Sequence, residues 1–117
     1  FPYTTLFRSV AARNQAIQDA TLNAIQVPLR TMQAAMSVFP LCRAMAEEGI
    51  PASVSDAAVG ALAARAAVVG AGMNVKINAA QLADKARASG MVAEAERLIK
   101  QACETERDIM NIVESKL

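Results

Sequence analysis

The segment SVSDAAVGALAARAAVVGAGMNVKINAA, residues 53–80, decides the fold of this chain. Ala, Val and Gly fill it between two polar ends, Ser55-Asp56 and Asn74-Val75-Lys76-Ile77-Asn78. Ala is the strongest helix former, and nothing here alternates polar and apolar residues as a half-buried strand does. We therefore expect one helix that ends near Ala79, with Ser53 as its N-cap and Asp56 completing a capping box.

The rest of the chain has the same helical character. The 117 residues are 54% apolar but only 3% aromatic, and they contain few Gly and Pro. A chain of this length suits one domain or a piece of one. We predict an all-α fold, a multi-helical bundle of long kinked helices that forms an incomplete domain.

Further helices are expected on both sides of the central segment. Steps of three and four residues favour a long helix from near Val10 towards Glu48, kinked or broken at Pro28 and Pro40. Its recurring apolar positions are Ile17, Ala20, Ala24, Val27, Ala34 and Val38. A short helix over residues 80–88, a turn at Ser89-Gly90 and a last helix over residues 91–116 are expected after Ala79.

The first nine residues, FPYTTLFRS, differ in character from the rest of the chain. They have no helical periodicity and hold most of the aromatic side chains. We interpret residues 1–9 as an adapter or fusion scar, and residues 10–117 as the helical domain.

Composition excludes several function classes. A net charge of +1, with 12 basic and 11 acidic residues, gives no electrostatic case for a nucleic acid or an acidic membrane surface. The absence of histidine removes the imidazole base and the common zinc sites. Cys42 and Cys103 have no metal-ligand spacing, and we expect small buried hydrophobes in a reducing compartment. The apolar run over residues 57–73 falls short of the roughly 20 residues that span a bilayer, so we expect a cytoplasmic protein without a membrane segment.

The two polar ends of the central helix lie on one side of it. Eighteen residues make five turns, so Asp56 and Asn74 share an azimuth, and Asn78 lies one turn further. Gly60, Ala63, Ala67, Gly70 and Ala71 lie on the face between them. The helical rise separates Asp56 from Asn74 by about 27 Å. Either the two ends contact different parts of a long ligand, or a second copy of the helix brings opposite ends together.

Each of these features has a purely structural interpretation as well. Asp56 can act as a helix-capping residue, and Asn74 and Asn78 can hydrogen-bond a neighbouring helix. The Gly/Ala face can be a packing seam. On the residues alone, a non-catalytic helical oligomerisation module stays open beside a binding site.

An ordered set of motifs resembles the formimidoyltetrahydrofolate cyclodeaminase/methenyltetrahydrofolate cyclohydrolase family. The set consists of Val27-Pro28-Leu29, Gly49, Ser55-Asp56, Gly70-Ala71, Asn74-Val75 and Ile77-Asn78. The match extends from about Arg13 to Lys85 and continues loosely through the last helix. Two departures stand out: Ile50 replaces the family's usual Asn after Gly49, and the family's opening Gly-rich segment is absent, so the chain corresponds to the C-terminal half of the domain.

The resemblance implies an all-helical enzyme that forms a homodimer or higher oligomer and acts on a tetrahydrofolate derivative with no cofactor and no metal. The family either closes 5-formimidoyltetrahydrofolate to the 5,10-methenyl form with release of ammonia, or hydrolyses the methenyl form. On this basis Asp56 is the candidate catalytic residue. Ser55, Asn74, Lys76 and Asn78 are the candidate substrate-binding residues.

Overall fold

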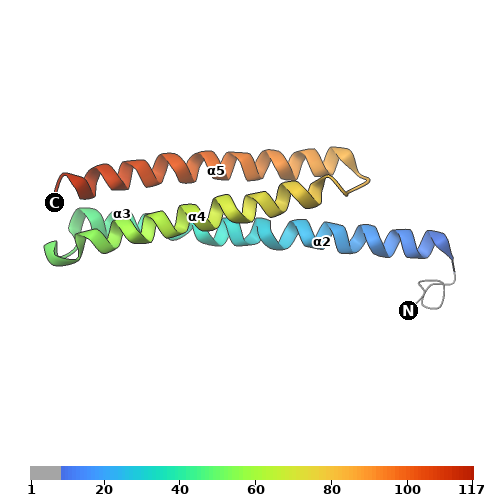
Figure 1. Ribbon diagram of the computed structural model, residues 1–117, viewed down its shortest axis with the longest axis horizontal. Coiled ribbons are helices and arrows are strands. Elements are labelled where there is room, and N and C mark those ends of the chain that lie inside the picture. Colours follow the sequence, from blue (N-terminus) through green and yellow to red (C-terminus); the bar gives the residue numbers. More distant parts are fainter. Residues whose placement is uncertain (1–8) are drawn as a thin grey trace.

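The computed structural model describes residues 9–117, which form a flat layer of helices (Figure 1). The elements in order are α2 (Val10–Met36), α3 (Phe39–Glu48), the 3₁₀ turn η1 (Pro51–Ser53), α4 (Val54–Ala79) and α5 (Lys85–Glu114). This part of the chain contains no strand, and the predicted all-α helical bundle is confirmed. Residues 1–8 of the interpreted adapter lie outside the described residues, and Ser9 is the N-cap of α2, where its Oγ accepts from the Ala12 N–H.

Helix α4 lies in the middle of the layer, between α2 and α5 (Figure 1). The principal extents of the molecule are 64 × 27 × 15 Å, so it is long and flattened, and α2 and α5 also contact each other beneath α4. Gly72 marks the closest approach, since a Cβ there would lie 2.7 Å from Ile99 Cδ1 of α5 and 3.2 Å from Met32 Cε of α2. Along its length α4 also buries Ala57, Ala58, Ala61, Ala64, Val68, Val75 and Ala79.

The predicted bounds of α4 are confirmed, but the predicted capping box is not formed. Ser53 is the N-cap and makes no side-chain capping hydrogen bond. The turn η1 explains this, because it directs the Ser53 N–H to the Ile50 carbonyl at 3.0 Å. The donor that Asp56 would have capped is therefore already bonded.

The predicted long first helix is two helices. Pro40 stands in the first turn of α3, where its missing N–H costs nothing, and the chain breaks at Ser37 and Val38. Pro28 stays inside α2. The apolar positions that recur along α2 face outward, and the chain buries Ile25 and Met32 instead.

The expected short helix over residues 80–88 and turn at Ser89-Gly90 are wrong. The turn is earlier, and α5 begins at Lys85 after an Asp84 N-cap whose Oδ1 accepts from the Arg87 N–H at 3.1 Å. Gln18 of α2 holds this turn by accepting from the Ala83 N–H at 2.8 Å. Gly90 lies in the exposed interior of α5 with an ordinary negative φ.

Helix α4 is apolar on its outer side as well as its inner side. Val59, Leu62, Met73 and Ile77 are between 39% and 67% exposed. By length and composition, the segment Pro51–Ala79 is long and apolar enough to cross a membrane. It is longer than the apolar run over residues 57–73, from which no membrane segment was expected. The core helix of a soluble bundle meets the same criteria, and α4 packs along both flanks against α2 and α5.

Candidate functional site

A groove of about 590 Å³ lies between α2 and α4. We call it the α2–α4 groove; its lining residues are Ala24, Val27, Pro28, Thr31, Ala66, Ala67, Gly70, Ala71, Asn74 and Asn78. Small residues form its floor, and the two asparagines stand at one end. Its volume falls within the range of small-molecule sites, roughly 300–1,000 Å³.

Pro28 and Asn78 are linked across this groove. Pro28 has no N–H, so the carbonyl of Ala24, four residues earlier, loses its helical partner. Asn78 Nδ2 donates to that Ala24 carbonyl at 3.4 Å and to the Asn74 carbonyl at 2.9 Å. The Asn78 amide is thereby held against α2 and its nitrogen is fully used. Its Oδ1 makes no hydrogen bond to residues 9–117 and is available to a ligand.

Asn74 stands one turn before Asn78 and is exposed at the groove. Its side-chain amide makes no hydrogen bond within the described part of the chain. An amide offers two donors and an acceptor, so Asn74 can bind a ligand edge that carries both. Thr31 lies on the facing wall, and its hydroxyl donates to the Val27 carbonyl at 3.2 Å. Thr31 was not predicted from the sequence as a site residue. The signal that could have identified it is its spacing of three residues from Pro28, which places both on one face of a helix.

Asp56 lies in a different hollow, which we call the α3–α4 cavity. This cavity of about 400 Å³ is lined by Leu41, Cys42, Met45, Gly49, Ile50, Ser53, Asp56 and Ala57. Asp56 is its single carboxylate and stands in the first turn of α4, where the helix dipole favours a negative charge. No ion pair or hydrogen bond joins the Asp56 carboxylate to residues 9–117.

Two other residues of this cavity explain its shape. Gly49 is required at the end of α3, because a Cβ there would collide with the Met45 carbonyl oxygen. Cys42 is buried against Gly60, and desolvation raises the pKa of its thiol. A thiol with a raised pKa carries little thiolate, so Cys42 serves as a small hydrophobe. Cys103 is partly buried on α5.

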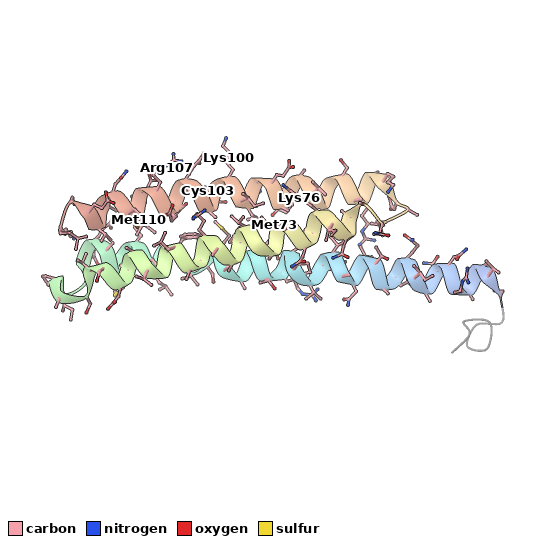
Figure 2. All side chains as sticks on the ribbon, viewed as in Figure 1. Met73, Lys76, Lys100, Cys103, Arg107 and Met110 are labelled. Carbon is pink, nitrogen blue, oxygen red and sulfur yellow. The ribbon has the colours of Figure 1, made fainter. Side chains whose placement is uncertain are left out.

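Ser55 and Lys76 line neither hollow. Ser55 is exposed in the first turn of α4. Lys76 faces α5, and its Nζ lies 3.7 Å from Glu96 Oε1 (Figure 2). The structure thus brings Asn74 and Asn78 together and leaves Asp56, Ser55 and Lys76 apart from them within one chain. Among residues 9–117, no three His, Cys, Asp or Glu side chains are placed to hold a metal ion.

Comparison with known proteins gives one family and two relatives. The family model described as formiminotransferase-cyclodeaminase matches residues 8–97. A methenyltetrahydrofolate cyclohydrolase of Methylorubrum extorquens is 36% identical over 107 residues, which cover 92% of this chain and 51% of that protein. A formimidoyltransferase-cyclodeaminase of Dictyostelium discoideum is 31% identical over 104 residues, covering 89% of this chain and 19% of the relative. The chain therefore spans about half the length of the first relative and about a fifth of the second.

Proposed function

Because the chain belongs to the formiminotransferase-cyclodeaminase family, we propose that it acts in folate one-carbon metabolism as a methenyltetrahydrofolate cyclohydrolase. The more similar of the two relatives described above is named for that reaction. The proposed substrate is a tetrahydrofolate derivative, with no further cofactor.

One observation carries this proposal: six of the motif residues that carry the family resemblance line one groove, while Gly49 and Asp56 line the α3–α4 cavity. Val27 and Pro28 come from α2, and Gly70, Ala71, Asn74 and Asn78 come from α4. These two segments are far apart in the sequence, yet their motif residues line the same hollow. The Gly/Ala floor gives a flat ring close access to the backbone, and the two amides supply hydrogen bonds at one end.

The hydrolysis has modest chemical needs. The oxygen of a water molecule attacks the cationic methenyl carbon and gives up one proton, which leaves a neutral hydroxyl adduct. The bond from that carbon to N5 then breaks, the hydroxyl proton passes to N5, and the 10-formyl form remains with one proton released overall. A carboxylate can accept the water's proton or stabilise the cation, and fixed amides can orient the ring. We assign the carboxylate role to Asp56 and the orienting role to Asn74 and Asn78.

Asp56 and Asn74 of one chain are too far apart for this chemistry. The helical rise separates them by about 27 Å along α4. The proposal therefore includes a homodimer in which one copy supplies the asparagines and the other supplies the carboxylate. Ser55 is proposed to contact the substrate beside Asp56 at the start of α4, whereas Lys76 faces Glu96 of α5, away from the groove.

A second candidate reaction is the cyclisation of 5-formimidoyltetrahydrofolate to the 5,10-methenyl form with release of ammonia. The family description and the name of the Dictyostelium relative favour it. The same groups serve both reactions, because both move protons beside a cationic one-carbon unit.

The experiment offers both substrates to the chain and follows the absorbance of the methenyl group. A falling absorbance with the methenyl form supports hydrolysis, and a rising absorbance with the formimidoyl form supports cyclodeamination. Gly70→Leu should fill the groove and abolish turnover, whereas Gly90→Leu is the matched control, since both glycines are helical, exposed and surrounded by open space.

Absence of both turnover and folate binding would contradict the enzyme proposal. Self-association without folate affinity would instead favour the non-catalytic oligomerisation module.

A further inference from the structure

Lys116, which follows the end of α5, reaches across to the end of α3. Its Nζ donates to the Ala46 carbonyl at 2.6 Å and to the Glu47 carbonyl at 2.8 Å, 70 and 69 residues earlier in the chain. The side chain starts from a fixed point, because the Lys116 N–H donates to the carbonyl of the buried Val113 at 2.9 Å. Lys116 therefore joins the last turn of α5 to the last turn of α3.

The two carbonyls need this partner because the sequence denies them another. The last carbonyls of a helix have no partner within it. The Gly49 N–H donates to the Met45 carbonyl at 2.9 Å, and Gly49 then turns the chain into an extended conformation. In a longer helix the N–H of residue 51 would serve the Glu47 carbonyl, but Pro51 has none. A positive charge is also favoured at a helix C-terminus, and α3 has no basic residue in its own last turn.

The segment that Lys116 holds forms one wall of the α3–α4 cavity. Gly49 lines this cavity and also the hollow that contains Lys116. After Gly49 the chain passes through Ile50 into η1, where the Ser53 N–H donates to the Ile50 carbonyl at 3.0 Å. It then enters the first turn of α4, which carries Asp56. A short, hydrogen-bonded stretch of backbone thus connects the carboxylate of the cavity to the Lys116 contact.

We infer that Lys116 is a positioning residue, which keeps the end of α3 closed against α4 and so buries Cys42 and places Asp56 in the cavity. The consequence for turnover rests on the proposed function, because it depends on the carboxylate role assigned there to Asp56. The consequence for Cys42 does not depend on folate. Cys42 lies between the two helices, 8% exposed, and a Cβ at Gly60 would lie 2.9 Å from its Sγ. Its thiol therefore reports any separation of α3 from α4.

The first test measures thiol modification in a Cys103→Ser background, where Cys42 is the one remaining cysteine. Lys116→Met removes the ammonium and keeps an apolar stem. It should raise the rate at which iodoacetamide modifies Cys42 about tenfold, because the charge-assisted hydrogen bonds that close the end of α3 are lost. Lys116→Arg keeps a positive charge and several donors, and should restore the slow rate. Lys100→Met is the matched control on α5, since Lys100 only approaches Glu104 at 4.0 Å, and it should leave the rate unchanged.

The urea dependence of this rate separates release of α3 from unfolding of the whole chain. A rate in Lys116→Met that hardly changes at low urea supports release of α3 alone. A rate that rises as steeply with urea as global unfolding would overturn the positioning role. An unchanged rate in Lys116→Met would overturn it as well, and so would a Lys116→Arg variant that reacts as fast as Lys116→Met.

Turnover of 5,10-methenyltetrahydrofolate supplies the second readout. Lys116→Met should lower kcat about tenfold, because small misplacements of a catalytic group are costly. KM should stay nearly unchanged, since none of the residues that Lys116 holds lines the α2–α4 groove. A raised KM with an unchanged kcat would overturn the link to Asp56. Absence of turnover in the parent chain would instead count against the proposed function, and the modification rates of Cys42 would still decide whether Lys116 closes the cavity.

Discussion

Asn78 joins two helices through a carbonyl that a proline has left without a partner. Its Nδ2 reaches the Ala24 carbonyl, 54 residues away in sequence, and the Asn74 carbonyl one turn away. The bond to Ala24 is long at 3.4 Å, but it satisfies an acceptor that the α2 backbone cannot serve. Asn78 therefore has a structural role through its nitrogen, and its Oδ1 makes no hydrogen bond within residues 9–117.

Replacement of Asn78 tests this link. Asn78→Ala should lower the free energy of unfolding by about 1 kcal/mol, because two hydrogen bonds are lost. The loss should shrink in a Pro28→Ala background, where residue 28 regains an N–H for the Ala24 carbonyl. Denaturant unfolding of the four proteins of this double-mutant cycle measures the coupling. Asn74→Ala is the matched control and should change stability by less than about 0.5 kcal/mol. An equal cost of Asn78→Ala in both backgrounds would refute the link.

Glu94, on the outer face of α5, makes a pH-dependent contribution to the stability of the folded chain. Arg97 Nη2 lies 2.8 Å from Glu94 Oε1, and its hydrogen bonds and positive charge lower the pKa of the Glu94 carboxyl. A lowered folded-state pKa means that the stabilisation is complete at neutral pH and is lost as the pH falls through that pKa. The effect is small, because water screens an exposed pair.

Thermal melts of Glu94→Gln should therefore show a slightly lower Tm than the parent chain at neutral pH and the same Tm in strong acid. Arg97→Gln should reproduce that pattern. A difference that persists unchanged into strong acid would show that the ion pair is not its cause.

At the scale of the helices, the two glycines Gly72 and Gly90 play opposite roles. Gly72 lies at the crossing of α2, α4 and α5, where a Cβ would press on Ile99 and Met32. Gly90 lies in an exposed stretch of α5, and a Cβ there would meet nothing within 4 Å. Only the first glycine has a packing reason to be there.

Alanine at these positions separates the two roles. Gly90→Ala should raise the free energy of unfolding by up to about 1 kcal/mol through helix propensity alone. Gly72→Ala should gain less or lose stability, because Ile99 and Met32 must move. Urea unfolding measures both. A destabilising Gly90→Ala would indicate a turn at Ser89-Gly90 and contradict the continuous α5.

The helices that could be predicted from the sequence are those with local start and stop signals. Ser53 and the preceding Gly49-Ile50-Pro51 determine where α4 begins, and Pro40 determines where α3 begins. Ser89-Gly90 resembled a turn, but Asp84 offered a better N-cap and Gln18 fixed the earlier turn from α2. The Gln18 hydrogen bond depends on how α2 packs beside this turn, so no signal in the sequence around the turn predicts it.

At the scale of the whole molecule, the site was only partly predictable. The position of Asn74 and Asn78 on one side of α4 follows from helical geometry, and so does the separation of Asp56 from them. The groove also needs Pro28 and Thr31 from α2, and their position depends on how α2 packs against α4.

The central claim is that the α2–α4 groove binds the folate. Amide hydrogen exchange of the chain with and without 5,10-methenyltetrahydrofolate tests it most directly. Protection is predicted over residues 24–31 and 66–78, with little change over the outer face of α5. Protection elsewhere with none at Asn74 and Asn78, or no change anywhere at saturating ligand, would contradict the claim.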